Sequence, residues 1–115
     1  MALTTNTVAY QDGIPNMATG KIVTDSGAAA ATTINLGFAP SYIKFVNQTD
    51  RIIDEWFTGM AAAESLHTAA NGTVTDESTN GITVVGVTAA GTQYSFTVTA
   101  TTMAASKTFY WVAFA

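Results

Sequence analysis

The chain has 115 residues, of which 10% are charged and 48% hydrophobic, and its formal net charge at pH 7 is −4. This length accommodates one domain with one core, and the absence of cysteine excludes disulfides and thiolate chemistry. The acidic balance argues against nucleic-acid binding, because the four cationic side chains, Lys21, Lys44, Arg51 and Lys107, are scattered and form no basic stripe.

Threonine and alanine replace many of the charges that an ordinary soluble domain carries. Threonine is β-branched and favours strands, and its uncharged hydroxyl forms hydrogen bonds with water on a solvent-facing side of a sheet. Such a surface suits a chain that packs against other protein. We therefore expect a small all-β structural or binding domain.

The first twenty residues are predicted to form an extended arm. Leu3–Tyr10 is extended in character, and residues 11–20 gather glycine, proline and asparagine. An ordinary edge strand with a long loop is the alternative. In an arm that reaches another molecule, Leu3, Val8 and Tyr10 are the candidate interface residues. No positive region precedes an apolar run, so we expect neither a secretory signal nor a membrane span.

Residues 21–115 are predicted to form a single all-β domain. In residues 94–99, for example, apolar side chains alternate with hydroxyls, which is typical of a half-buried strand. Residues 60–66 are either a helical turn or a loop. Six to eight short strands, separated by glycine-containing turns, predict an antiparallel β-sandwich of jelly-roll-like type or a small barrel. The predicted strands are residues 21–24, 31–36, 42–46, 52–57, 81–87, 94–99 and 108–114.

Two pairs of adjacent aromatic residues are candidates for an interface. Neighbouring residues on a strand point to opposite faces. One member of Trp56–Phe57, and one of Tyr110–Trp111, should therefore enter the core while the other faces outward or meets a partner. Burial on both faces is the alternative. The last predicted strand is apolar on both faces, so it is either central or covered by a second protein. The candidate interface residues in this part of the chain are Trp56, Phe57, Met60 and Trp111.

No catalytic, cofactor-binding or metal-binding residue is predicted. His67 is the single histidine, so a multi-histidine zinc site cannot form. It would act as a base only if a carboxylate reached it in the fold, and we expect a surface or interface histidine. Residues 50–55 are expected to be a solvated turn with local ion pairs. Phosphate-binding loops and nucleophile elbows are missing from the sequence, so we do not expect an enzyme.

Three runs of sequence carry a family resemblance. Residues 34–47 read INLGFAPSYIKFVN, residues 49–60 contain the run EWFTGM, and residues 107–113 read KTFYWVA. Together they resemble small tailed-bacteriophage virion proteins, notably head decoration (cement) proteins. The resemblance implies a β-sandwich or jelly roll that forms dimers or trimers. It also implies binding to the outside of an assembled capsid, where such a protein staples neighbouring major capsid subunits, after synthesis in the host cytoplasm.

Two other functions remain open at this point. One is a different virion component, such as a tail, fibre or connector module. The other is a carbohydrate-binding sandwich that uses exposed aromatic residues. Under the decoration hypothesis the expected partners are the major capsid protein and further copies of this chain. Neither nucleic acid nor membrane is expected as a partner, and no cofactor or metal is expected.

Overall fold

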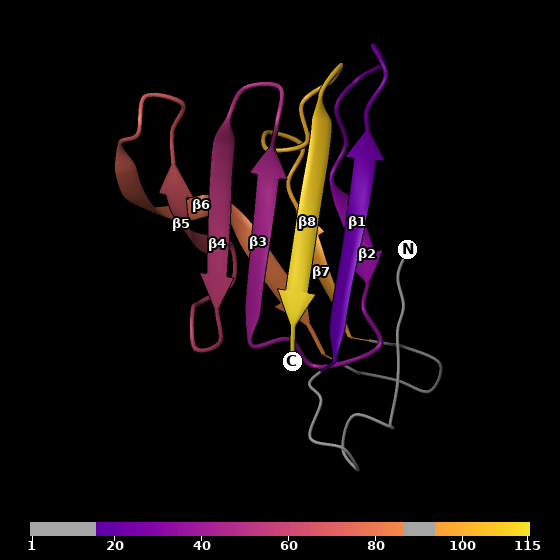
Figure 1. Ribbon diagram of the computed structural model, residues 1–115, viewed down its shortest axis with the longest axis vertical. Helices are drawn as coiled ribbons and strands as arrows, with labels where there is room; N and C mark the ends of the chain where they lie inside the picture. The colour runs from indigo at the N-terminus through magenta and orange to yellow at the C-terminus, as the bar shows by residue number, and fades with distance from the viewer. Residues whose placement is uncertain (1–15, 87–93) are drawn as a thin grey trace.

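Eight antiparallel strands form one curled sheet in the computed structural model, which describes residues 16–86 and 94–115 (Figure 1). The sheet order is β1-β8-β3-β4-β5-β6-β7-β2, and the described ranges contain no helix. The prediction of an all-β, β-sandwich-like fold is therefore confirmed. The strands are β1 (Met17–Val23), β2 (Thr32–Asn35), β3 (Tyr42–Asn47), β4 (Ile52–Phe57), β5 (Glu64–Thr68), β6 (Val74–Val85), β7 (Ser95–Val98) and β8 (Thr108–Phe114).

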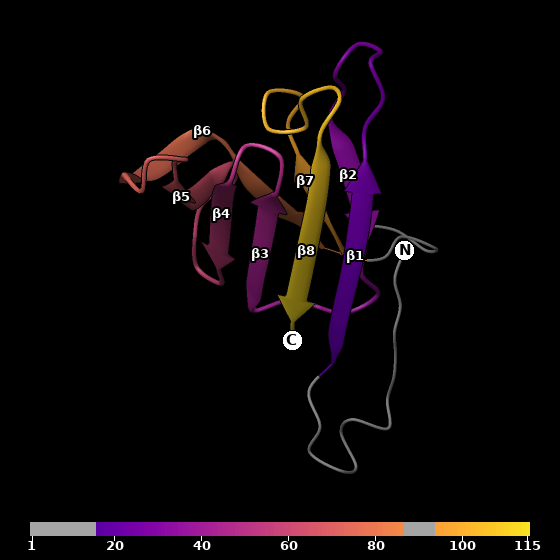
Figure 2. The same cartoon turned by 45° about the horizontal axis from the view of Figure 1, so that its top comes forward.

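Curling divides the sheet into two layers. Strands β1, β8, β3 and β4 form a front layer, and β6, β7 and β2 lie behind it (Figures 1 and 2). The β5–β6 hairpin lies at the side where one layer passes into the other. A single sheet thereby buries one of its faces against itself, as the two sheets of a sandwich do.

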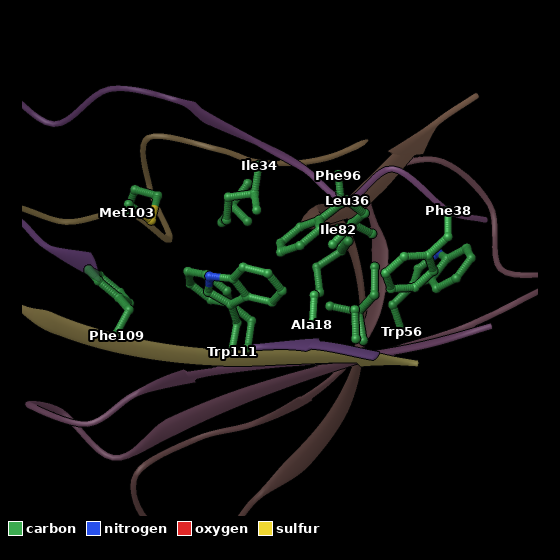
Figure 3. Close-up of a cluster of buried hydrophobic side chains, with 14 residues drawn as sticks. Ala18, Ile34, Leu36, Phe38, Trp56, Ile82, Phe96, Met103, Phe109 and Trp111 are labelled. Atoms are coloured by element: carbon green, nitrogen blue, oxygen red, sulfur yellow. The ribbon is translucent and has the colours of Figure 1, made fainter. Parts of the chain in front are cut away.

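The strands form because their side chains alternate between the inside and the outside of this curl. In β3, Ile43 and Phe45 are buried while Tyr42 and Lys44 are half-buried on the other face. In β8, Phe109, Trp111 and Ala113 point inward. The core lies between the layers (Figure 3). Its buried members are Ala18, Ile34, Leu36, Phe38, Ile43, Phe45, Trp56, Ile82, Phe96, Val98, Met103, Phe109, Trp111 and Ala113.

Phe96 of β7 connects the two layers through aromatic contacts. Its ring centroid lies 5.4 Å from that of Trp111 and 6.4 Å from that of Phe45, both in edge-to-face geometry. Phe45 in turn stacks on Phe109 at 5.3 Å. Edge-to-face pairs contribute about 0.5–1.5 kcal/mol each beyond the burial of their area. This aromatic group therefore fixes how the rear layer sits on the front layer.

Two glycines allow close approach inside the fold. A Cβ atom at Gly20 would lie 2.3 Å from the Trp111 Nε1 atom, so the indole packs directly on the β1 backbone. A Cβ atom at Gly81 would lie 2.4 Å from the backbone carbon of Glu64, at the irregularity in β5–β6 pairing between Glu64 and Ser65. At both positions only glycine fits without a shift of the neighbouring atoms.

The structure differs from the predicted elements in two places. Strand β5 was not predicted, and β6 begins at Val74 instead of residue 81. In the segment left open as a helical turn or a loop, residues 60–63 form a loop, and residues 64–66 already belong to β5. In addition, β1 begins at Met17 and pairs with β8, so the sheet includes residues expected to belong to the arm. The arm residues Leu3, Val8 and Tyr10 lie outside the described ranges.

Candidate functional site

On the outer face of the front layer, the strand register assembles a group of large apolar side chains. Along one row, β-pairing places Met17 beside Phe114, Phe114 beside Tyr42, and Tyr42 beside Phe57. The Tyr42 ring lies 5.1 Å from the Phe57 ring and 6.2 Å from the Phe114 ring, measured between centroids. In the next rows, Tyr110, Val112, Val46 and Ile53 extend the apolar surface.

Several of these side chains are exposed although they are large and apolar. Met17 is 50% exposed, Phe57 44%, Tyr110 40% and Phe114 37%. In Figure 1 the front layer faces the viewer, and no other strand crosses it. Contiguous apolar patches on monomeric proteins commonly mark surfaces for other proteins. We call this surface, formed by the outward residues of β1, β8, β3 and β4, the outer face.

A few polar groups are set among the apolar side chains of the outer face. The Tyr42 hydroxyl donates a hydrogen bond to Glu55, and the Lys21 ammonium lies 5.7 Å from the Tyr110 ring centroid. Burial raises the pKa of Tyr42 to about 12, with further contributions from the hydrogen bond to Glu55 and from its charge. Glu55 is thus held in a fixed position beside the aromatic row.

The structure separates the predicted interface residues into two groups. Trp56 and Trp111 are only 6% and 5% exposed and belong to the core, so neither indole presents a surface to a partner. Each tryptophan has the strand parity that points inward, and its neighbour, Phe57 or Tyr110, has the parity that points outward. Phe57 lies on the outer face, whereas Met60 is partly buried against the core.

A second candidate site is a cleft beside β4 and β5, which we call the His67 cleft. Pairing of β4 with β5 places Asp54 directly opposite His67. The Asp54 Oδ1 atom lies 2.9 Å from His67 Nδ1 and accepts a hydrogen bond from Ser65 Oγ, also at 2.9 Å. The Asp54 side chain is 4% exposed and that of His67 28%. A carboxylate therefore does reach His67, and residues 50–55 are not simply a solvated turn.

Further acidic groups line the same cleft of about 280 Å³. Glu77 accepts hydrogen bonds from the backbone N–H groups of Thr79 and Asn80, and these bonds lower the pKa of its carboxyl group. A hydrogen bond from the ammonium of Lys107, 3.2 Å away, lowers the pKa of Asp50. At neutral pH Asp50 and Glu77 are therefore ionised, and they line the cleft together with apolar residues such as Phe45 and Ile52.

The order of groups in the His67 cleft differs from that of a nucleophilic triad. In such a triad the histidine lies between the hydroxyl and the carboxylate. Here the carboxylate of Asp54 lies between Ser65 and His67, and Ser65 is fully buried. With Nδ1 bonded to Asp54, the Nε2 atom of His67 is the ring nitrogen left for a ligand. Among the described residues, no group of three or more potential ligands could hold a metal ion.

Sequence reasoning missed the Asp54–His67 pair and the aromatic row of the outer face. The pair depends on the β4–β5 register, which could not be read before β5 was recognised. The row was in principle accessible, because Tyr42, Phe57 and Phe114 are the outward-parity aromatics of three predicted strands. The missing information was which strands are neighbours.

No family model matches the chain, and neither the curated proteins nor the solved structures compared with it give a match. In residues 16–86 and 94–115, no helix has the length and apolar character needed to cross a membrane.

Proposed function

We propose that this chain is a structural protein that docks through its outer face on a larger protein assembly, as a decoration protein on the exterior of a phage capsid does. Its partners are the major capsid protein and further copies of itself. The observation that carries the proposal is the aromatic row on three neighbouring strands, in which half-buried Tyr42 lies between exposed Phe57 and Phe114.

The exposed area is large enough for a useful contribution to binding. A fully covered phenylalanine side chain buries about 150–250 Å². Because Phe57 and Phe114 are 44% and 37% exposed, docking removes roughly 80 Å² more of each ring from water, which is worth about 2 kcal/mol per ring. Many copies on a symmetric lattice need only modest affinity each, since the contacts act together. Binding to the assembled form stabilises it by mass action.

The sequence runs that resemble phage decoration proteins support the capsid as the assembly. They include all of β3 and β4 and most of β8, three of the four strands that build the outer face. The charge pattern agrees, because an acidic chain with scattered cations does not compete for a packaged nucleic acid. A tail, fibre or connector component is the alternative location for the same docking surface.

Binding to capsids tests this function. Phage heads that lack the protein are mixed with purified protein, and the bound fraction is measured after sedimentation. Saturable binding in a symmetric stoichiometry is expected, and the variants Phe57→Ser and Phe114→Ser should each weaken it about 30-fold. The matched control is Val74→Ser, a change at a 55% exposed residue on β6 away from the outer face. Binding that is absent, or equally weakened by all three variants, contradicts the proposal. If the protein copurifies with phage tails and not with heads, it is a tail component.

A second candidate function, binding of a small hydroxylated ligand such as a sugar, is favoured by the His67 cleft. Its carboxylates accept hydrogen bonds from hydroxyls, and the free ring nitrogen of His67 is available beside them. Titration with a panel of methyl glycosides, followed by NMR signals of His67 and Asn80, tests this function. Saturable shifts in the unsubstituted protein, with loss of the Asn80 shifts in His67→Ala, support it, and a flat titration eliminates it.

A further inference from the structure

The two edges of the curled sheet lie on either side of a groove. Strands β1 and β2 are at opposite ends of the sheet order and are not hydrogen-bonded to each other. Figures 1 and 2 show β2 behind β1 in both views. A groove of about 250 Å³ lies between them, and we call it the seam. Its lining residues include Gly20, Lys21, Ile22, Thr33, Ile34 and Asn35.

The backbone of β1 presents hydrogen-bonding groups to the seam that have no partner among residues 16–86 and 94–115. At the two ends of the β1–β8 ladder, Thr24 N–H donates to the Lys107 carbonyl and Ala115 N–H donates to the Asn16 carbonyl, both at 2.9 Å. Antiparallel strands exchange bonds at every second residue. The even-numbered residues of β1 therefore bond to β8, and the N–H and C=O groups of odd-numbered residues, such as Lys21, face the seam.

The backbone of β2 presents matching groups from the other side. Leu36 N–H donates to the Tyr94 carbonyl at 2.8 Å, in the same register as the β2–β7 ladder. Ile34 therefore bonds to β7, whereas the backbone groups of Thr33 and Asn35 face the seam. Within the part of the chain that the structure describes, two unpaired strand edges thus bound one groove. Exposed edges of this kind pair readily with an added strand, and native proteins usually cover them.

We propose that the seam binds residues 3–10 of a second copy of this chain as an additional strand. This segment is rich in threonine and contains Val8 and Tyr10, residue types that favour strands. It belongs to the fifteen residues that precede the first residue of the described domain, Asn16. In the seam, alternate side chains of the segment contact Trp111 and Ile34, which line the groove. The proposal deepens the proposed function, on which it rests, by naming how copies bind each other.

The shortest hairpin turns do not bring the same segment of its own chain into the seam in register. The Asp12-Gly13 pair favours a two-residue hairpin turn. After such a turn, the segment would direct its hydrogen bonds to Ala18 and Gly20, whose backbone groups already face β8. A loop one residue longer would place Pro15 at the closing pair, where it has no N–H to donate. A segment from a second copy enters the seam without these restrictions, as in other exchanged-strand dimers.

Disulfide cross-linking between two full-length variants tests the proposal. Because the chain has no native cysteine, only the introduced cysteines can form disulfides. One preparation carries Asn35→Cys, and the other, with an affinity tag, carries a single cysteine at residue 5, 6, 7 or 8. After mixing and mild oxidation, the expected result is disulfide-linked pairs of one tagged and one untagged chain. Their yield should alternate along the segment, because successive side chains point to opposite faces.

A proline substitution in the acceptor chain supplies the matched control. Lys21→Pro removes an N–H that faces the seam and leaves the β1–β8 hydrogen bonds intact, so it should abolish the cross-links. Lys21→Ala keeps the N–H and should preserve them. Cross-links without alternation, or unaffected by Lys21→Pro, overturn the proposal. The proposal is also overturned if a chain that carries both cysteines forms an internal disulfide while the mixture of the two single-cysteine variants forms no disulfide-linked pairs.

Amide hydrogen exchange of the unmodified full chain gives a second, independent readout. The Thr33 and Asn35 amides should be protected at high protein concentration and should exchange at least tenfold faster after dilution to the monomer. Fast exchange at every concentration contradicts the proposal even if Lys21→Pro fails to fold. Phe57→Ser and Phe114→Ser should leave both readouts unchanged, so a failed seam and a failed outer face are distinguishable.

Discussion

Replacing Gly20 with alanine tests the packing of Trp111 on the β1 backbone. The added methyl carbon would lie 2.3 Å from Nε1 and 2.5 Å from Cε2 of the indole, well inside contact distance. Trp111 is 5% exposed and makes an edge-to-face contact with Phe96, so the ring has little room to move. Overpacking of this kind costs about 1–3 kcal/mol. The smaller entropy of the unfolded alanine chain offsets roughly 0.4–1 kcal/mol of that cost.

The expected net loss is therefore about 1–2 kcal/mol of unfolding free energy, or roughly 4–10 °C in Tm. Thermal unfolding followed by circular dichroism measures it, and tryptophan fluorescence reports the displaced indole. Gly86→Ala is the matched control, because its methyl carbon would lie 3.6 Å from the Tyr94 ring, an ordinary contact. A Gly20→Ala protein as stable as the Gly86→Ala protein, with unchanged fluorescence, would refute the reasoning.

Three further predictions concern polar groups. Ser65→Ala removes a buried donor to the cleft carboxylate and should cost about 1–2 kcal/mol in chemical denaturation; an unchanged midpoint contradicts this. In ultraviolet titration Tyr42 should ionise near pH 12, and Glu55→Gln should lower that value. Because the pKa of Tyr42 is higher in the folded than in the unfolded protein, the protonated hydroxyl stabilises the fold. This contribution to the free energy of unfolding is complete below pH 10 and is lost between pH 10 and about 12. A hydrogen bond with Glu64 and repulsion from its charge raise the pKa of Asp76. The protonated Asp76 therefore stabilises the fold at low pH, and this stabilisation is lost as the pH rises through the raised pKa. Asp76→Asn should therefore raise the unfolding midpoint at pH 7 more than at pH 3. A larger increase at pH 3 would contradict the repulsion between Asp76 and Glu64.

Two strands could be predicted with correct bounds from the sequence. Residues 52–57 and 108–114 coincide with β4 and β8, because both runs are rich in β-branched and aromatic residues, which favour strands. The hairpin of β5 and the first half of β6 could not be predicted in this way. Residues 74–80 are mostly exposed on both faces, so hydrogen bonds hold them in the sheet without an alternating apolar pattern.

The candidate sites depend on information that alternation does not contain. Parity shows that Trp56 and Phe57 point to opposite faces, but the burial of Trp56 follows from where the rear layer lies. Asp54 shares the inward parity of Trp56, and only the β4–β5 register shows that His67 and Ser65 satisfy its carboxylate. The seam arises from the curl of the whole sheet, which depends on contacts far apart in the sequence.

Cryo-electron microscopy of the assembled particle tests most directly whether the outer face of β1, β8, β3 and β4 is covered by protein. If the outer face is the docking surface, Tyr42, Phe57 and Phe114 lie within about 4.5 Å of apolar atoms of a neighbouring subunit. A particle in which this chain is bound through another surface, with these three rings open to solvent, would show that the outer face is not the docking surface.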